Sequence, residues 1–362
     1  MRIVRALLWV ASATAVAGFL FAAFHHMFGA APLDPIETAL VTHATRIANG
    51  GEVYVQPPDP TTPALMPGFP FLLSALQQTF GSDLWLPRLL ALLAALGAAA
   101  LIVWILKMEG QDWTLAVSGA GLMLAGYTLL AGGPGVARPE PIMLLLVLLG
   151  YMTLRFTHGI TGVLVAVLLF AAACLTQLTA VWFTAAACVS QVFDERKRLV
   201  VLVLAMGVVF GGGYVMLSER WGWFNAATWE TLMRTVQFAP FGLLHFAGDE
   251  LLGKLGVLTL TIVLSFALPN PGWRARGGIW LYMGAAMVGV GLLATQSARV
   301  GPQALIPTVT VLAILGPLSM QRVTKHLSSW PGSTRVAGQG VVQAALALQF
   351  FMFLSSLPPS LL

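Results

Sequence analysis

Charge is scarce in this sequence. Only 9% of the 362 residues are Asp, Glu, Lys or Arg, whereas 58% are hydrophobic and the mean hydropathy is +0.84. A soluble domain of this length needs far more charged surface, so that class of protein is excluded. Segments with the alternating pattern of strands are also absent, which argues against a transmembrane barrel.

Cysteine is scarce as well. The chain has two, Cys174 and Cys188, and both lie inside apolar segments. They exclude a disulfide framework and a cysteine metal centre. The basic residues raise the sequence pI to about 9.6, but they are scattered between apolar segments. They therefore indicate membrane topology and predict no nucleic-acid partner.

Long apolar runs fill the rest of the chain. Runs of about 20 residues match the thickness of a bilayer core and predict membrane-spanning helices. We expect an all-α, polytopic integral membrane protein with about 11 transmembrane helices, at 5–24, 84–106, 113–131, 140–156, 160–175, 178–193, 199–217, 251–268, 278–296, 302–320 and 338–357. The first is interpreted as an uncleaved span. A shorter apolar segment, 66–80, is expected to lie in the interface without crossing.

The basic residues also predict the orientation of these spans. With a cytoplasmic N-terminus, twelve basic residues fall inside and seven outside, and the dense cluster at 194–198 is inside, as the positive-inside rule requires. The C-terminus is then periplasmic, in a bacterial inner membrane. Two long outer loops remain, 25–83 and 218–250, and the first contains an expected interfacial helix at 35–49. We treat 1–362 as a single transmembrane domain.

Acidic residues gather at the predicted outer face. Asp34 and Glu37 follow the first span, and Glu140 opens a later span next to Arg138. Charged groups at a membrane are costly and usually functional. A structural explanation also fits, because Asp34 suits a helix N-cap, Glu37 stands near a capping-box position, and the helix dipole favours Glu140. The sequence leaves both interpretations open.

Several short motifs follow one another in a set order. They are Asp34 with Glu37, Gly50-Gly-Glu-Val-Tyr54, Pro67-Gly-Phe-Pro70, Leu86-Pro-Arg-Leu89, Ala137-Arg-Pro-Glu140, Leu175-Thr-Gln-Leu-Thr179, Arg196-Lys-Arg198 and Ser297-Ala-Arg-Val-Gly301. In this order the chain resembles the GT-C membrane glycosyltransferases, in particular the relatives of the protein mannosyltransferases and of the lipid A aminoarabinose transferase. The resemblance implies a GT-C-like fold with interfacial helices in the first outer loop.

The resemblance also implies roles for individual residues. An acid of the first outer loop takes the proton from the acceptor hydroxyl, Glu140 orients the substrate or helps to bind a metal, and Arg299 binds the lipid phosphate. The predicted catalytic residues are Asp34, Glu37 and Glu140, and the predicted substrate-binding residues are Arg138, Arg299, Arg88 and Tyr54. No metal ligand is predicted, because His25, His26 and His245 form no ligand pattern. No cofactor is assigned, although the resemblance leaves a divalent metal open.

The function implied by the resemblance is transfer of a sugar from a polyprenyl-phosphate donor to an acceptor hydroxyl at the outer face of the membrane. The absence of a glycine-rich nucleotide loop fits such a donor. The alternative is a non-catalytic GT-C-like scaffold subunit of a larger membrane complex, which Gln177 favours because relatives commonly carry lysine there. A transporter is disfavoured, since the span centres hold almost no charge. The expected partners are the lipid-linked sugar, membrane lipid and, for a scaffold, other subunits.

Overall fold

The fold consists of helices. A computed structural model describes residues 2–29, 31–54, 65–130, 135–228, 242–268, 278–295, 305–327 and 331–355, and no strand occurs among them. The chain divides into two compact units. The first unit comprises Met1–Ala22, Ala99–Pro134 and Phe238–Leu362, and the second unit comprises Ala23–Ala98 and Gly135–Gln237. The prediction of an all-α protein is confirmed.

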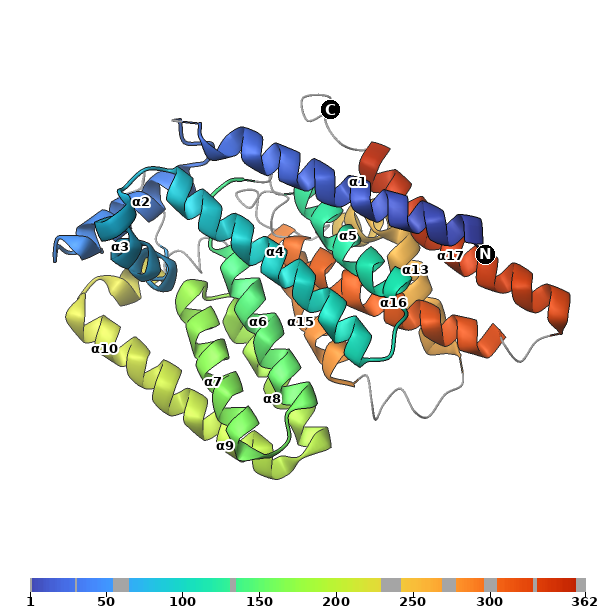
Figure 1. The fold of residues 1–362 in the computed structure, drawn as a ribbon. Coiled ribbons are helices and arrows are strands. Elements are labelled where there is room, and N and C mark those ends of the chain that lie inside the picture. The colour runs from blue at the N-terminus through green and yellow to red at the C-terminus, as the bar shows by residue number, and fades with distance from the viewer. Residues whose placement is uncertain are drawn as a thin grey trace. The chain divides into compact units, whose positions relative to one another are not determined.

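The helices follow the predicted order along the chain (Figure 1). They are α1 (Arg2–Met27), α2 (Pro35–Ala48), α3 (Gly68–Phe80), α4 (Trp85–Met108), α5 (Trp113–Leu130), α6 (Glu140–Phe156), α7 (Gly159–Thr176), α8 (Ala180–Asp194), α9 (Arg196–Met206), the π-helix η1 (Gly207–Gly211), α10 (Gly212–Arg220), α12 (Gly242–His245), the π-helix η2 (Phe246–Lys254), α13 (Gly256–Ala267), α15 (Gly278–Thr295), α16 (Ile306–Leu327) and α17 (Gly332–Ser355).

Six of the described helical segments are long and apolar enough to cross a membrane. They are Arg2–Met27, Trp85–Met108, Trp113–Leu130, Gly159–Thr176, Arg196–Arg220 and Ile306–Leu327, and four shorter apolar segments accompany them. A polytopic membrane protein is therefore confirmed, whereas the predicted total of eleven spans stays a prediction. The span predicted at 199–217 is a continuous rod in which α9, η1 and α10 follow one another. Glycines at both ends of η1 suit the wider π-helical turn, because they place no side chain against it.

In the second unit, a bundle of helices supports the first outer loop. Helices α6, α7, α8 and α9 pack together (green to yellow-green in Figure 1), and α3 packs on both α2 and α7. The predicted helix at 35–49 is α2, and the predicted apolar segment 66–80 forms α3. An apolar core joins these two helices to the starts of α4 and α6; its residues are Leu40, Ala44, Phe69, Leu73, Leu86 and Ala137.

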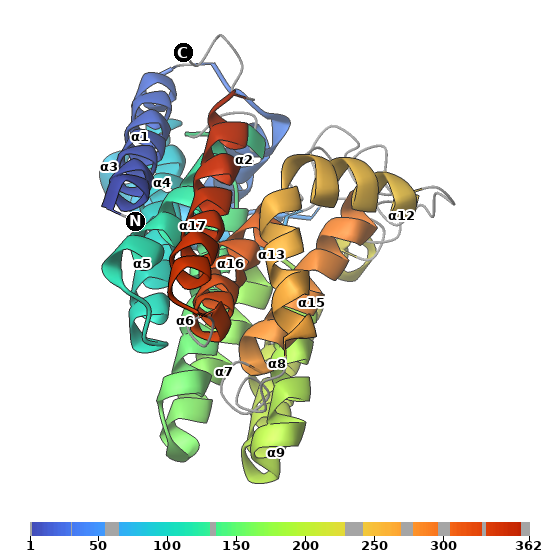
Figure 2. The same cartoon turned by 90° about the vertical axis from the view of Figure 1, so that its right-hand side faces the viewer.

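In the first unit, α16 is the central helix. It packs against α5, α13, α15 and α17 (Figure 2). Small residues allow this close packing, as is usual between membrane helices. A Cβ atom on Gly119 of α5 would stand only 2.6 Å from the carbonyl oxygen of Ala313 in α16. The backbones of α5 and α16 are therefore in direct contact at this glycine.

We expect Gly119→Ala to destabilise the first unit, because backbone atoms cannot move aside as a flexible side chain can. Overpacking of this kind costs about 1–3 kcal/mol. Gly289→Ala in α15 is the matched control, since its added Cβ meets nothing within 4 Å. Thermal unfolding in detergent measures both variants. Equal melting temperatures for the two would contradict the proposed contact.

Candidate functional site

Asp34 caps α2 and also pairs with a cation. Its backbone has the extended conformation of an N-cap, and its Oδ1 accepts a hydrogen bond of 2.8 Å from the N–H of Ile36. The predicted N-cap is thus confirmed. Its second oxygen, Oδ2, accepts a hydrogen bond from Nη2 of Arg138. The Asp34 side chain remains 16% exposed.

Glu37 makes more contacts than a capping box requires. The predicted capping box would return its carboxylate to the N–H of Asp34, and this prediction is wrong. Oε2 instead accepts from the Leu33 N–H at 2.8 Å, and Oε1 accepts from the Ala137 N–H at 2.7 Å. Burial alone would raise the pKa of Glu37, but these bonds and those from Arg88 outweigh burial and hold the pKa below its ordinary value.

Arg88, in the first turn of α4, forms hydrogen bonds with Glu37 and with the backbone of the segment that follows α1. Its side chain is fully buried. Nε and Nη2 bind the two oxygens of Glu37 at 2.9 and 2.8 Å, Nη1 binds the carbonyls of His26 and Gly29, and Nη2 also binds the carbonyl of Ala31. All five N–H bonds of the guanidinium are therefore used, and its predicted contact with substrate stays a prediction.

Glu140 and Gln177 complete a buried polar cluster with Asp34 and Arg138. Glu140 begins α6, accepts a hydrogen bond from the Gln177 side chain and interacts electrostatically with both Arg138 and Asp34. In the described part of the chain, Nε and Nη1 of Arg138, Oε2 of Glu140 and Oε1 of Gln177 are buried without a partner. Buried polar atoms are nearly always satisfied in native proteins, so this concentration indicates a place for a ligand.

The three acids predicted as catalytic thus divide into two groups. Asp34 and Glu140 belong to the polar cluster, whereas Glu37 faces Arg88 and the backbone. Sequence reasoning missed the contribution of Gln177, which had been noted only as a departure from lysine. It also missed His43, whose Nδ1 is buried without a partner and whose pKa is lowered to about 4 by burial and by Arg46.

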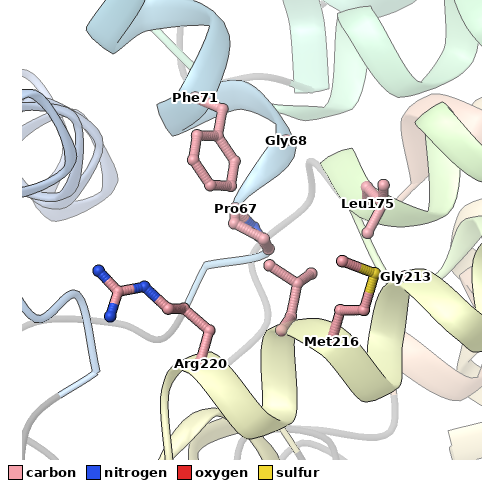
Figure 3. A pocket seen from close by; sticks show the side chains of 8 residues that line it. Pro67, Gly68, Phe71, Leu175, Gly213, Met216 and Arg220 are labelled. Carbon is pink, nitrogen blue, oxygen red and sulfur yellow. The ribbon is translucent and has the colours of Figure 1, made fainter.

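The second unit also contains a cavity. It has a volume of about 430 Å³ and is lined by Pro67, Gly68, Phe71, Leu175, Gly213, Met216, Leu217 and Arg220 (Figure 3). Its walls are apolar, and in Figure 3 the guanidinium of Arg220 points away from Leu175 and Met216. Leu175 stands two residues before Gln177, and the start of α3 lies against its backbone, because a Cβ on Gly68 would be 2.7 Å from the Leu175 carbonyl oxygen.

The remaining predicted positions lie elsewhere. Tyr54 is buried, donates its hydroxyl to the carbonyl of Leu65 and packs on Trp221 and Phe224 at ring-centroid distances of 5.5 and 5.2 Å. Its predicted role in substrate binding stays a prediction. Arg299 lies outside the described residues.

The histidines give no metal centre that the structure can identify. No group of three or more His, Cys, Asp or Glu side chains suited to a metal ion occurs among the described residues. His25 and His26 pack ring against ring at the end of α1, and His245 pairs with Asp249 at an exposed position. Within the described ranges, therefore, no ligand set can be named for a divalent metal.

No protein-family model matches the chain, and a comparison with curated proteins finds no match. Solved structures do match. Two crystal structures of ArnT from Cupriavidus metallidurans, one bound to undecaprenyl phosphate and one in the apo state, superpose on this chain with TM-scores of 0.62 and 0.61. The sequence identity is 14%, and each match covers 96% of this chain and 75% of ArnT. The archaeal oligosaccharyltransferase AglB from Archaeoglobus fulgidus, in complex with an inhibitory peptide and a dolichol-phosphate, gives 0.60 at 15% identity.

The match to AglB covers 97% of this chain but only 55% of AglB, so the chain spans about half the length of that enzyme. ArnT and AglB are both membrane glycosyltransferases of the GT-C fold. At these identities the likeness shows the fold, and the predicted GT-C fold of an integral membrane protein is confirmed.

The charge of Glu37 should make stability depend on acidity. Its pKa in the folded protein lies below the ordinary 4.5, so its contribution is complete above that value and is lost as the pH falls through the folded-state pKa. We expect Glu37→Gln to lower the melting temperature at about pH 7 and to flatten its decline between about pH 5 and pH 3. Thermal unfolding in detergent measures this. Glu52→Gln, at an exposed position of the same loop, is the control. A loss that is equal at every pH would contradict the assignment.

Proposed function

We propose that this integral membrane protein of the GT-C fold is a glycosyltransferase, which moves a sugar from a polyprenyl-phosphate donor to an acceptor hydroxyl at the outer face of the membrane. The observation that carries the proposal is the buried cluster of Asp34, Arg138, Glu140 and Gln177, with its unpaired donors and acceptors. The apolar cavity of the same unit supplies a place for a lipid.

The polar cluster suits a sugar phosphate. The free N–H groups of Arg138 can donate to phosphate or sugar oxygens, and Glu140 and Gln177 can accept from sugar hydroxyls. A polar group that stays unpaired in a buried site costs free energy. A ligand that brings both donors and acceptors removes that cost at all three side chains.

The cavity suits the carrier lipid. An isoprenoid chain needs an apolar wall, which this cavity supplies. The Arg220 side chain extends outward from the cavity lining, where it can meet a phosphate that remains outside (Figure 3). The solved ArnT and AglB structures contain undecaprenyl phosphate and dolichol-phosphate respectively. These ligands support, by analogy of fold, a lipid phosphate as the carrier for this chain. Arg299, which was predicted to bind the same phosphate, stays a prediction.

The proposed reaction is a displacement at the anomeric carbon. The acceptor oxygen forms a bond to this carbon, the bond from the carbon to the phosphate oxygen breaks, and the carrier phosphate leaves with the electron pair. The Asp34 carboxylate, on a side chain that is 16% exposed, takes the hydroxyl proton as a general base. Glu140 and Gln177 orient the sugar, and Arg138 stabilises the negative charge that develops on the phosphate.

The proposed reaction requires the cluster to face the outer side of the membrane. That orientation follows from the distribution of basic residues, which favours a cytoplasmic N-terminus and a periplasmic C-terminus in a bacterial inner membrane. The whole chain is proposed to act as one transmembrane domain, with the first outer loop carrying the acid that serves as base.

A non-catalytic scaffold subunit remains the second candidate. One observation favours it: both oxygens of Asp34 already accept hydrogen bonds, one as the cap of α2 and one from Arg138. A residue that is only structural needs no further partner. Substitution of Asp34 separates the two candidates.

We expect Asp34→Asn to lower transfer by about 10²-fold or more while the protein stays folded, because an amide caps a helix but cannot accept the proton. Release of polyprenyl phosphate from polyprenyl-phosphate-linked sugars, with membrane extract as acceptor source, measures turnover. Asp34→Ala, which loses the cap as well, should in addition lower stability by about 0.5–2 kcal/mol. Full turnover in Asp34→Asn, or a wild type that is inactive with every donor, would favour the scaffold.

We expect Gly213→Leu to weaken binding of undecaprenyl phosphate, because the new side chain enters the apolar cavity. The backbone tolerates a side chain there, since a Cβ on Gly213 meets nothing within 4 Å. Gly211→Leu, on the same helical rod with equally open surroundings and outside the cavity lining, is the control. Native mass spectrometry of the purified protein with the lipid measures both. Equal binding by the two variants would place the lipid elsewhere.

A further inference from the structure

We infer that Glu37 and Arg88 are positioning residues, which hold Asp34 and Arg138 in the arrangement that the proposed reaction uses. Both had been predicted to touch substrate, one as a catalytic acid and one as a binding residue. The inference rests on the proposed function for its purpose. Its geometry concerns the cluster alone and can be tested without any donor.

The hydrogen bonds of Glu37 fall on two particular backbone positions. One oxygen binds the N–H of Leu33, the residue before Asp34, and the other binds the N–H of Ala137, the residue before Arg138. The two segments are about one hundred positions apart in sequence. A single carboxylate therefore fixes the backbone immediately ahead of both members of the Asp34–Arg138 pair.

These bonds exceed what helix capping explains. A capping-box acid needs only the N–H of the N-cap residue of its own helix. The bond to Ala137 does not cap α2. It fixes the position of the backbone that leads into α6. Between segments 33–37 and 137–140, as the structure describes them, the hydrogen bonds run through the side chains of Glu37 and Arg138 alone.

Arg88 in turn fixes Glu37. Arg88 donates two hydrogen bonds to the Glu37 carboxylate. Its three remaining N–H groups donate to the carbonyls of His26, Gly29 and Ala31, at the end of α1 and just after it. Both side chains are fully buried. A buried pair without spare donors leaves no freedom to shift, and removal of one partner leaves an unpaired charge. Arg88 therefore acts through Glu37 on Asp34.

The accessibility of the Asp34 carboxylate reports this positioning directly. In the wild type, the bond from Arg138 shields it. We expect Glu37→Gln to raise carbodiimide labelling of Asp34 by about 5-fold or more, because the amide cannot accept all four hydrogen bonds and the pair separates. The experiment uses the purified full-length protein in lipid nanodiscs, with peptide mass spectrometry as readout. Arg138→Gln gives the labelling level of a fully broken pair.

The matched control is Arg198→Gln. Arg198 is another buried arginine of the second unit, and it binds the carbonyls of Leu154 and Thr157 at the end of α6 remote from Glu140. This variant should lower the melting temperature while leaving Asp34 labelling at the wild-type level. Arg88→Lys and Glu37→Asp, which keep the charges, should label Asp34 to an intermediate degree and serve if Glu37→Gln fails to fold.

The outcomes are distinct. Wild-type labelling of Asp34 in folded Glu37→Gln or Arg88→Lys would overturn the inference, as would equal labelling in Arg198→Gln. Turnover adds a second readout: a positioning role lowers kcat and shifts its pH profile per folded molecule, whereas a merely structural role changes only the folded fraction. An inactive wild type with increased Asp34 labelling in the variants would remove the proposed function and leave the positioning intact.

Discussion

The buried ion pair between Glu37 and Arg88 is the constraint on which the outer part of the second unit depends. Water cannot solvate either charge, so each must find all of its hydrogen bonds within the protein. Five N–H donors and two carboxylate oxygens then fix the end of α1, the start of α2, the start of α4 and the entry to α6. Two of the fixed backbone positions, Leu33 and Ala137, immediately precede Asp34 and Arg138 of the polar cluster.

The apolar helices and their order could be read from the sequence, because a bilayer allows few alternatives to a helix of sufficient length. The cap at Asp34 was also predictable, since the Asp-Pro start of α2 is a local pattern. Local patterns failed where the deciding contact was distant. Arg88 looks like any arginine beside a span, and only the folded chain brings it to Glu37, 51 positions away.

The candidate site shows the same division. Glu140 was predicted because acids at a span entrance are rare, and it does meet Arg138. Gln177 carried no such signal, because an uncharged glutamine at the end of α7 is ordinary in sequence. Its importance comes from the turn between α7 and α8, which the close approach of Gly68 to Leu175 holds beside α3. Tyr54 was predicted to bind substrate, and the structure places it in an apolar core against which Leu175 and Leu178 of the same turn region pack.

The exposure of the cavity wall has a consequence for selectivity. Met216 is 72% exposed and Phe71 is 42% exposed, so the cavity opens at the surface of the second unit. A lipid tail that enters from the bilayer leaves one apolar medium for another and gains little from the hydrophobic effect. Binding then depends on the density of the carrier in the plane of the membrane rather than on its concentration in water. Under the proposed function, discrimination between carriers falls to the headgroup, whose phosphate and sugar would exchange hydration for contacts with the buried polar cluster.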